Sequence, residues 1–170
     1  MKRLFICLLV FAVNYTQAQI TKVTIQASGL TCSMCSNSIN KALKSLEFVD
    51  KVDANIKNSS FDISFKPNEA VDFDKLKKKV EGAGFFVANF TATIRFDNVK
   101  ILNDSSVNVG ANTFHFLNVK QQILNGDKTI RLLDKGFLST KEYKKNTNLI
   151  KADSYKKGLQ NGNRVFHVTI

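Results

Sequence analysis

The chain has few cysteines, and this scarcity excludes one class of exported protein. Its 170 residues include only three of them, Cys7, Cys32 and Cys35. Small exported domains that depend on disulfides have more cysteines at wider spacings. Cys32 and Cys35 are separated by only two residues. We therefore expect this pair to form a local chemical site rather than part of a disulfide framework.

Long hydrophobic runs are also lacking. The most apolar segment is Leu4–Val13, about half the roughly 20 residues that a membrane-spanning helix needs. It follows the basic pair Lys2 and Arg3 and precedes the small-residue ending Thr16-Gln17-Ala18, an order typical of a secretory signal peptide. We predict that residues 1–18 are removed, that the protein is exported to the periplasm or cell envelope of a bacterium, or secreted, and that it has no stable membrane insertion afterwards.

Catalytic sequence patterns are missing as well. The sequence has no Ser-His-Asp order, no paired carboxylates spaced for acid–base chemistry and no glycine-rich phosphate loop, so we predict that the protein is not an enzyme. Its two histidines, His115 and His167, each stand between apolar neighbours in strand-like segments, which favours a structural role. An auxiliary Cu(II) site is the alternative, if the fold brings the two rings together.

Charge distinguishes the two parts of the chain. The net charge is +11. Residues 19–90 hold 10 basic and 8 acidic side chains, whereas residues 91–170 hold 13 and 6. An acidic partner or surface would therefore meet the second part, although a solubilising role is the preferred explanation of the excess. Nucleic acid is not an expected partner, since an exported protein seldom meets it.

Residues 19–90 have the pattern of a small α+β domain. Apolar side chains alternate in the segments predicted as strands, and they recur every three to four residues in the segments predicted as helices. The predicted order is strand 22–27, helix 34–46, strands 52–56 and 61–65, helix 73–83 and strand 86–90. This βαββαβ order predicts a ferredoxin-like sandwich, with both helices on one face of an antiparallel sheet.

Residues 91–170 predict a small, mostly-β domain. Strand-like segments cover 91–102, 105–109, 113–123, 128–133 and 164–170, and a short helix is expected at 139–146. Asn125-Gly126 predicts a hairpin, and Asn161-Gly162 predicts a second turn. We expect an OB-like barrel or a sandwich. The predicted division of the chain is therefore signal peptide 1–18, ferredoxin-like domain 19–90 and β-rich domain 91–170.

The loop between the first predicted strand and helix has the composition of a soft-metal site. Its sequence is Gly29-Leu30-Thr31-Cys32-Ser33-Met34-Cys35. Two cysteines at a helix start can turn both sulfurs toward one point, where unpaired N–H groups stabilise thiolates. Thiolates favour soft ions such as Cu(I), and two ligands suit such an ion better than they suit structural zinc.

Residues 21–90 resemble the heavy-metal-associated domain of copper chaperones, copper-transporting P-type ATPases and the periplasmic mercury-binding protein. The family's Gly-Met-Thr-Cys-x-x-Cys loop is matched at residues 29–35, with Leu30 in place of Met, and its Ala-Gly-aromatic segment is matched by Ala83-Gly84-Phe85. The resemblance implies that Cys32 and Cys35 are the metal ligands. It also implies supporting positions for Thr31 and Phe85. Met34 is a possible third ligand, although an exposed loop position is the preferred interpretation.

Together these observations predict an exported protein that binds Cu(I) for trafficking or sequestration. Its expected partner is a metal-donor or metal-acceptor protein such as a copper transporter, and we expect a monomer or weak dimer. Hg(II), another toxic metal or Zn(II) are alternative cargoes. A thiol–disulfide redox protein that uses Cys32 and Cys35 is a further alternative, because Cys-x-x-Cys at a helix start is also the pattern of redox motifs.

Overall fold

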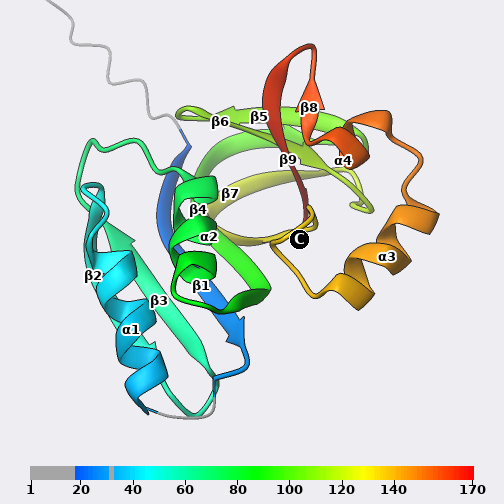
Figure 1. The fold of residues 1–170 in the computed structure, drawn as a ribbon. Helices are drawn as coiled ribbons and strands as arrows, with labels where there is room; N and C mark the ends of the chain where they lie inside the picture. The colour runs from blue at the N-terminus through cyan, green and yellow to red at the C-terminus, as the bar shows by residue number, and fades with distance from the viewer. Residues whose placement is uncertain (1–17, 31–32) are drawn as a thin grey trace, which may run out of the picture.

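One mixed β-sheet runs through the protein (Figure 1). The computed structural model describes residues 18–30 and 33–170. In these residues the elements are β1 (Gln19–Ser28), α1 (Ser33–Lys44), β2 (Val49–Asn55), β3 (Ser60–Phe65), α2 (Phe73–Gly82), β4 (Phe86–Ile101), β5 (Ser105–Val109), β6 (Asn112–Phe116), β7 (Gln122–Leu132), α3 (Thr140–Leu149), α4 (Asp153–Lys157), β8 (Leu159–Gln160) and β9 (Asn163–Thr169). The predicted signal peptide lies almost entirely outside the described residues. None of the helices described is long and apolar enough to cross a membrane.

The first part of the sheet confirms the predicted ferredoxin-like arrangement. Its strands follow the order β2-β3-β1-β4, and each neighbouring pair is antiparallel. Helices α1 and α2 lie on the same face, where they bury an apolar stripe against the strands. That stripe consists of Ile39, Leu43, Phe73, Leu76 and Val80, each fully buried. Apolar residues that recur every two positions in the strands and about every 3.6 positions in the helices therefore predicted both the elements and their buried faces.

Strand β4 joins the two parts of the chain. It is 16 residues long, and the boundary predicted between residues 90 and 91 falls inside it. One edge of β4 pairs with β1 and the other edge pairs with β7. Thr91, for example, is opposite Thr24 on one side and Arg131 on the other. The edge that an isolated ferredoxin-like sandwich exposes is thus covered by the second part of this chain.

The expected barrel or separate sandwich is not what residues 91–170 form. Their strands extend the existing sheet in the order β4-β7-β9-β6-β5, and this path stays open among the described residues. Strands β6 and β9 are parallel, whereas β7 and β9 are antiparallel. The sequence signals for single strands could not show whether these strands close into a barrel or extend the existing sheet. The two arrangements differ only in which strands pair.

The prediction of a hairpin at Asn125-Gly126 was wrong. Both residues lie within the continuous strand β7, opposite β4. The β4–β7 register shifts between Phe96 and Val99, next to Gly126, which has a φ of +71°. The dipeptide therefore lies at a β-bulge instead of a turn, a second setting that requires positive φ.

Two other local signals were confirmed. The helix expected at 139–146 is α3, and the N–H of Glu142 donates a hydrogen bond to Ser139 Oγ (3.3 Å), so Ser139 caps it. Asn161 and Gly162 have φ values of +51° and +82° and form the turn between β8 and β9. Both signals depend on neighbours in sequence, which explains why they could be predicted.

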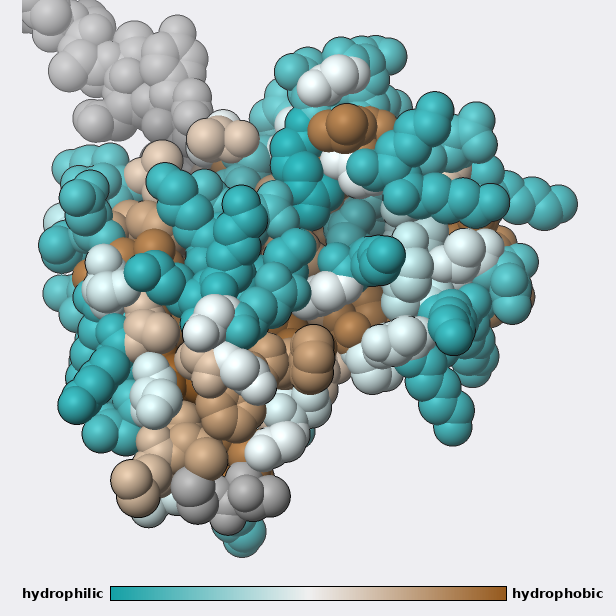
Figure 2. Space-filling view, in the orientation of Figure 1, coloured by the Kyte–Doolittle hydropathy of each residue, from teal (hydrophilic) through white to brown (hydrophobic). Residues whose placement is uncertain are grey.

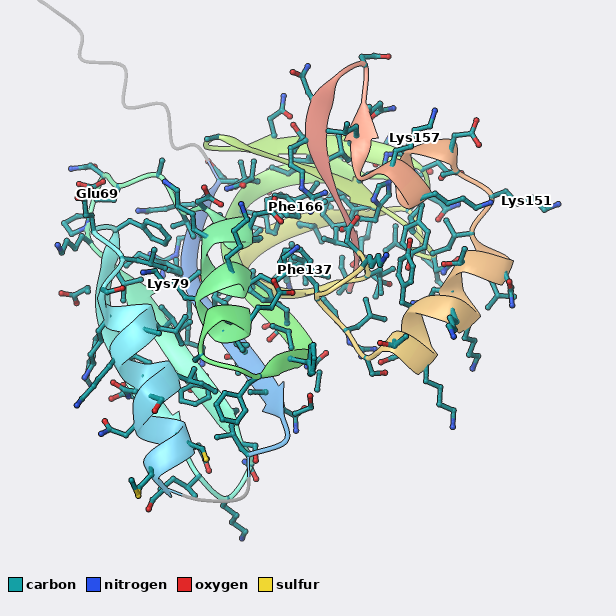
Figure 3. All side chains as sticks on the ribbon, in the orientation of Figure 1. Glu69, Lys79, Phe137, Lys151, Lys157 and Phe166 are labelled. Atoms are coloured by element: carbon teal, nitrogen blue, oxygen red, sulfur yellow. The ribbon has the colours of Figure 1, made fainter. Side chains whose placement is uncertain are left out.

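An aromatic cluster ties the second part of the chain to α2. Phe73 of α2 lies 5.0 Å from Phe90, 5.8 Å from Phe114 and 5.3 Å from Phe166, measured between ring centroids. Phe137 packs edge-on against Phe90 and Phe166. Figure 3 labels Phe137 and Phe166. All five rings are buried within the main apolar core. This core is therefore shared by helix α2 and by strands from both parts of the chain.

An ion pair links the same elements at the surface. Arg164 of β9 donates from Nε to Asp74 Oδ2 of α2 (2.8 Å), and its guanidinium lies 4.0 Å from the Phe166 ring centroid. Burial on its own would raise the pKa of Asp74. The hydrogen bonds and positive charges of Arg164 and Lys77 outweigh this effect and hold the pKa of Asp74 below its ordinary value.

The opposite face of the extended sheet is covered by the α3–α4 segment. Leu117, Leu133, Ile150 and Tyr155 form a second, smaller buried cluster there. Because side chains alternate along a strand, His115 and His167 point to this face while Phe114 and Phe166 point to the main core. The second part of the chain therefore has apolar packing on both faces.

We predict that Phe73→Ala destabilises the whole chain by about 3–5 kcal/mol, because it removes a fully buried ring that contacts three others. Urea unfolding followed by circular dichroism measures this loss. Phe86→Ala is the control, because the Phe86 side chain is 73% exposed. Equal unfolding midpoints for the two variants would contradict the role given to Phe73.

We predict that Asp74→Asn lowers the free energy of unfolding at pH 7 by about 1 kcal/mol. The folded pKa of Asp74 is depressed, so its ionised carboxylate stabilises the fold above the unfolded pKa of about 3.9, and this contribution is lost as the pH falls through the folded value. The difference between variant and wild type should therefore shrink in acid. Asp53→Asn, which breaks an exposed pair with Lys51, is the control. A constant difference between pH 7 and pH 3 would contradict this account.

Candidate metal centre

The candidate metal loop lies where β1 ends and α1 begins. Gly29 follows β1 with a φ of +83°, a backbone conformation that residues with a Cβ seldom adopt. Leu30 is half-buried and packs against the main core. The replacement of the family's Met by Leu therefore preserves an apolar contact beneath the loop. Thr31 and Cys32, which are central to the prediction, lie outside the described residues.

Cys35 is in the first turn of α1 and is half-buried. That turn contains no acidic residue, while Lys41 and Lys44 are in the last turn. The first turn of α1 is the positive end of the helix dipole, and it has no carboxylate that would add negative charge there. This environment stabilises an anionic thiolate at Cys35. The donor type and its electrostatic surroundings fit a soft cation.

Met34 points outward from the same turn. Its side chain is 80% exposed, in agreement with the preferred interpretation of an exposed loop residue. Phe86, the first residue of β4, is 73% exposed. Figure 2 shows that hydrophobic surface gathers at the lower end of the molecule, around the start of α1. This end of the protein therefore offers apolar contact area beside the candidate metal loop.

The segment Ala83-Gly84-Phe85 closes helix α2 and returns to the loop. The N–H of Phe85 donates to the Val80 carbonyl (3.2 Å), and Gly84 has a φ of +88°, the geometry of a helix-terminating Schellman motif. Phe85 is half-buried against the core. Ser28 pairs with Phe86, so Phe85 and Gly29 stand at the same end of the sheet. Phe85 is thus near the loop start, as the resemblance implies.

A groove beside this end is walled by the second part of the chain. Its volume is about 300 Å³. Ser28, Phe86 and Glu81 form one side, and Lys135, Leu138 and Tyr143 are among the residues of the other. Residues 135–143 therefore approach the end of β1 that leads into the candidate metal loop.

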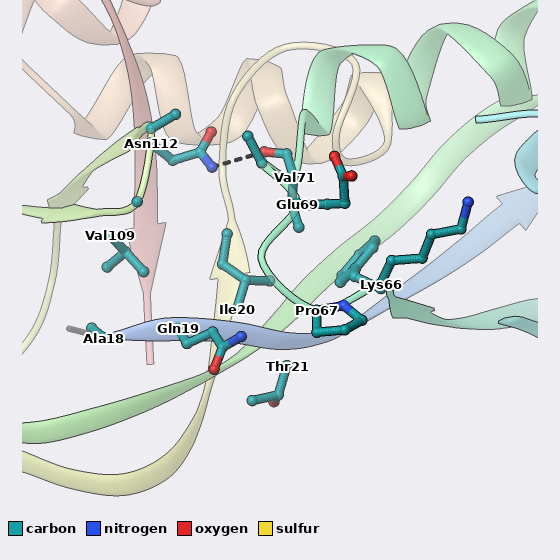
Figure 4. Close-up of a pocket in the computed structure, with 14 residues that line it drawn as sticks. Ala18, Gln19, Ile20, Thr21, Lys66, Pro67, Glu69, Val71, Val109 and Asn112 are labelled. Carbon is teal, nitrogen blue, oxygen red and sulfur yellow. Dashed lines mark hydrogen bonds between the residues drawn. The ribbon is translucent and has the colours of Figure 1, made fainter. Parts of the chain in front are cut away.

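A separate cavity of about 330 Å³ lies at the other end of β1 (Figure 4). Ala18, Pro67, Val71 and Asn112 are among its lining residues, and Asn112 Nδ2 donates to the Val71 carbonyl (2.9 Å). Among residues 18–30 and 33–170, no cysteine or histidine lines this cavity. Its chemistry therefore does not suit a soft metal.

The structure does bring His115 and His167 together. They are opposite each other on β6 and β9, with ring centroids 5.4 Å apart. Each ring already has two hydrogen-bond partners: Ser106 and Asp104 for His115, and Asp134 and Ser154 for His167. Within residues 18–30 and 33–170, no group of three or more His, Cys, Asp or Glu side chains is arranged to hold a metal ion. The predicted auxiliary Cu(II) site thus lacks a third ligand of these types.

Comparison with known proteins assigns the first part of the chain. Residues 24–86 match the family model of the heavy-metal-associated domain. Residues 24–86 are a heavy-metal-associated domain. This match covers β1 through the start of β4, and so it includes the loop and the Ala83-Gly84-Phe85 segment.

Curated relatives of this heavy-metal-associated domain are copper transporters. A probable copper-exporting P-type ATPase of Archaeoglobus fulgidus is 34% identical over 71 residues, which are 42% of this chain and 9% of that protein. A copper-exporting P-type ATPase of Staphylococcus saprophyticus is 37% identical over 73 residues, 43% of this chain and 9% of that protein. The chain thus spans about a tenth of the length of these relatives.

Two solved structures are also similar. The yeast copper transporter domain Ccc2a is 30% identical and aligns over 39% of this chain and 90% of that one, with a TM-score of 0.36. Oxidised MerP from Ralstonia metallidurans CH34 is 30% identical and aligns over 42% and 94%, with a TM-score of 0.37. The family assignment rests on the domain model, which spans the loop.

We predict that Met34→Leu leaves Cu(I) affinity within about threefold of the wild type, because the exposed thioether is not needed as a ligand. Competition against a chromogenic Cu(I) chelator measures the affinity. Cys35→Ser is the matched comparison in the same helical turn and should lose tight binding. A loss of tenfold or more in Met34→Leu would instead identify Met34 as a third ligand.

Proposed function

We propose that this chain binds Cu(I) through Cys32 and Cys35 and serves in copper trafficking or sequestration outside the cytoplasm. The main support is the Cys-x-x-Cys sequence at the start of α1 in a heavy-metal-associated domain. Soft thiolates select soft ions, and two of them suit a low-coordinate Cu(I). The curated relatives that are named as copper-exporting ATPases favour copper over other soft metals.

The proposed mechanism is ligand exchange. Two thiolates on Cu(I) sum to a charge of −1, which the start of α1 stabilises, since it has no acidic residue in its first turn. A thiolate from a partner can add to such a two-coordinate ion before one cysteine departs. Transfer therefore needs a partner site that can approach the loop closely.

The proposed partner is a metal-donor or metal-acceptor protein such as a copper transporter. Met34 and Phe86 give this end exposed apolar area. The groove formed with residues 135–143 adds Lys135 next to it. A protein with an apolar patch and acidic residues around its own metal site would complement this surface. A monomer or weak dimer keeps the loop accessible to such a partner.

An anaerobic titration of reduced residues 19–170 with Cu(I), in competition with a chromogenic chelator, tests the proposal. We expect one tight equivalent in the wild type and none in Cys32→Ser/Cys35→Ser. Both proteins should have the same far-ultraviolet circular dichroism, because serine is close to cysteine in size and Cys35 is only half-buried.

Absence of tight Cu(I) binding by the reduced wild type would contradict the copper proposal. Parallel titrations with Hg(II) and Zn(II) then identify the alternative cargoes. Binding of none of these ions, together with a Cys32–Cys35 reduction potential in the range of thiol–disulfide oxidoreductases, would favour a redox protein.

Export is the second part of the proposal and has its own test. Expression of the full chain with fractionation of the cells should give a mature protein in the envelope or medium whose mass corresponds to a chain beginning at Gln19. The control deletes residues 2–18 and should stay in the cytoplasm. A full-length mass in the cytoplasm would contradict export.

A further inference from the structure

A serine, a histidine and an aspartate form one hydrogen-bonded chain on the α3–α4 face of the sheet. Ser154 Oγ lies 2.9 Å from His167 Nε2, and His167 Nδ1 lies 2.9 Å from Asp134 Oδ1. Asp134 Oδ2 also accepts the backbone N–H of His167 (2.7 Å). The three residues come from α4, from β9 and from the segment after β7. Their order along the chain, Asp, Ser, His, gave no sign of this arrangement.

The hydrogen bonds fix the tautomer of His167. Because the Asp134 carboxylate can only accept, the proton on the ring is at Nδ1. Nε2 then has a lone pair, and the Ser154 hydroxyl donates to it. This is the arrangement in which a histidine can take the proton of a serine during nucleophilic attack.

The surroundings hold the ring in this orientation. His167 is fully buried, and Asp134 is 3% exposed. The Tyr155 ring meets the His167 ring edge-on at 5.3 Å, and the Tyr155 hydroxyl donates to the Leu133 carbonyl. Asp134 is further approached by Arg164 at 3.8 Å. The buried Asp134–His167 pair is therefore shielded from water, and its orientation toward Ser154 is preorganised for proton transfer.

Ser154 itself is accessible. It is only partly buried and lines a cavity of about 420 Å³. The polar residues Asn103, Asn118, Gln160 and Lys151 line the same cavity, together with Asp104 and His115. Amide and ammonium groups of this kind are the hydrogen-bond donors that can stabilise an oxygen that gains negative charge. The cavity therefore combines a nucleophile with a polar wall suited to a small ester.

We propose that Ser154 is an activated nucleophile that hydrolyses small polar carboxylic esters, with His167 as its general base and Asp134 as the residue that positions His167. The Ser154 oxygen bonds to the ester carbonyl carbon while its proton moves to His167 Nε2. The alcohol then leaves with that proton, and an acyl group remains on Ser154. Water releases the acyl group by the reverse sequence of proton transfers.

A fluorophosphonate probe tests this directly on the intact chain. Attack by Ser154 forms an oxygen–phosphorus bond and releases fluoride, and the adduct is located by peptide mass spectrometry. We expect a single adduct on Ser154 in the wild type and none in Ser154→Ala. Ser106→Ala is the matched control, since Ser106 also hydrogen-bonds a histidine on this face but does not line the cavity, and it should label like the wild type.

The positioning role of Asp134 requires a kinetic measurement. Asp134→Asn should slow labelling by about 100-fold or more, because the amide favours the wrong tautomer of His167. In the hydrolysis of p-nitrophenyl acetate, Asp134→Asn should lower kcat and leave KM nearly unchanged, because Asp134 positions His167 and does not line the cavity. Hydrolysis of p-nitrophenyl acetate should follow the same order of variants.

Failure of the folded wild type to form an adduct on Ser154 would overturn the proposal and leave the Asp134–His167–Ser154 chain as an anchor for α4. An Asp134→Asn variant that is folded, by circular dichroism, and labels at the wild-type rate would overturn it equally. If Asp134→Asn does not fold, the comparison of Ser154→Ala with Ser106→Ala decides. Cu(I) binding is unaffected by any of these outcomes, so the two functions are tested independently.

Discussion

The hydrogen bonding of β4 on both of its edges is the constraint on which the rest of the structure depends. A ferredoxin-like sandwich ends at this strand, and its outer edge would be a row of unpaired backbone groups. Here β4 extends to 16 residues, and β7 pairs with that edge. The pairing directs β9, β6 and β5 into the same sheet. It also sets Phe90 of β4 against Phe73 and Phe137, and so the shared core follows from the shared strand.

The pairing of β4 also decides how the second part of the chain can influence the candidate metal loop. The β4–β7 pairing continues to Arg131, and from there the chain passes through Lys135 and Leu138 beside Phe86. Residues 135–143, which form one wall of the groove, are therefore held in place by the sheet and not by a flexible linker. A partner that approaches the heavy-metal-associated domain from this side would meet both parts of the protein at once.

Sequence alone predicted the elements of the first part well, because its signals are local. Alternation in β1 and the apolar stripes on α1 and α2 all depend on residues a few positions apart in sequence. The open sheet of the second part, the bulge at Gly126 and the contacts of His167 could not be found in this way. Each depends on which distant strand lies opposite, and the same Asn-Gly pair suits a hairpin or a bulge equally well. At the candidate metal loop, the cysteine spacing predicts the chemistry, whereas the packing of Leu30 and Phe85 against the core could be seen only in the fold.

Hydrogen exchange measured by mass spectrometry at increasing denaturant tests most directly whether β4 joins both parts into one folding unit. Peptides from β1 and β3 report on the heavy-metal-associated domain, and peptides from β6 and β9 report on the second part. If the account is correct, the most protected amides of both sets open with the same free energy and the same denaturant dependence. Loss of protection in β6 and β9 at a lower denaturant concentration, with β1 and β3 still protected, would contradict it.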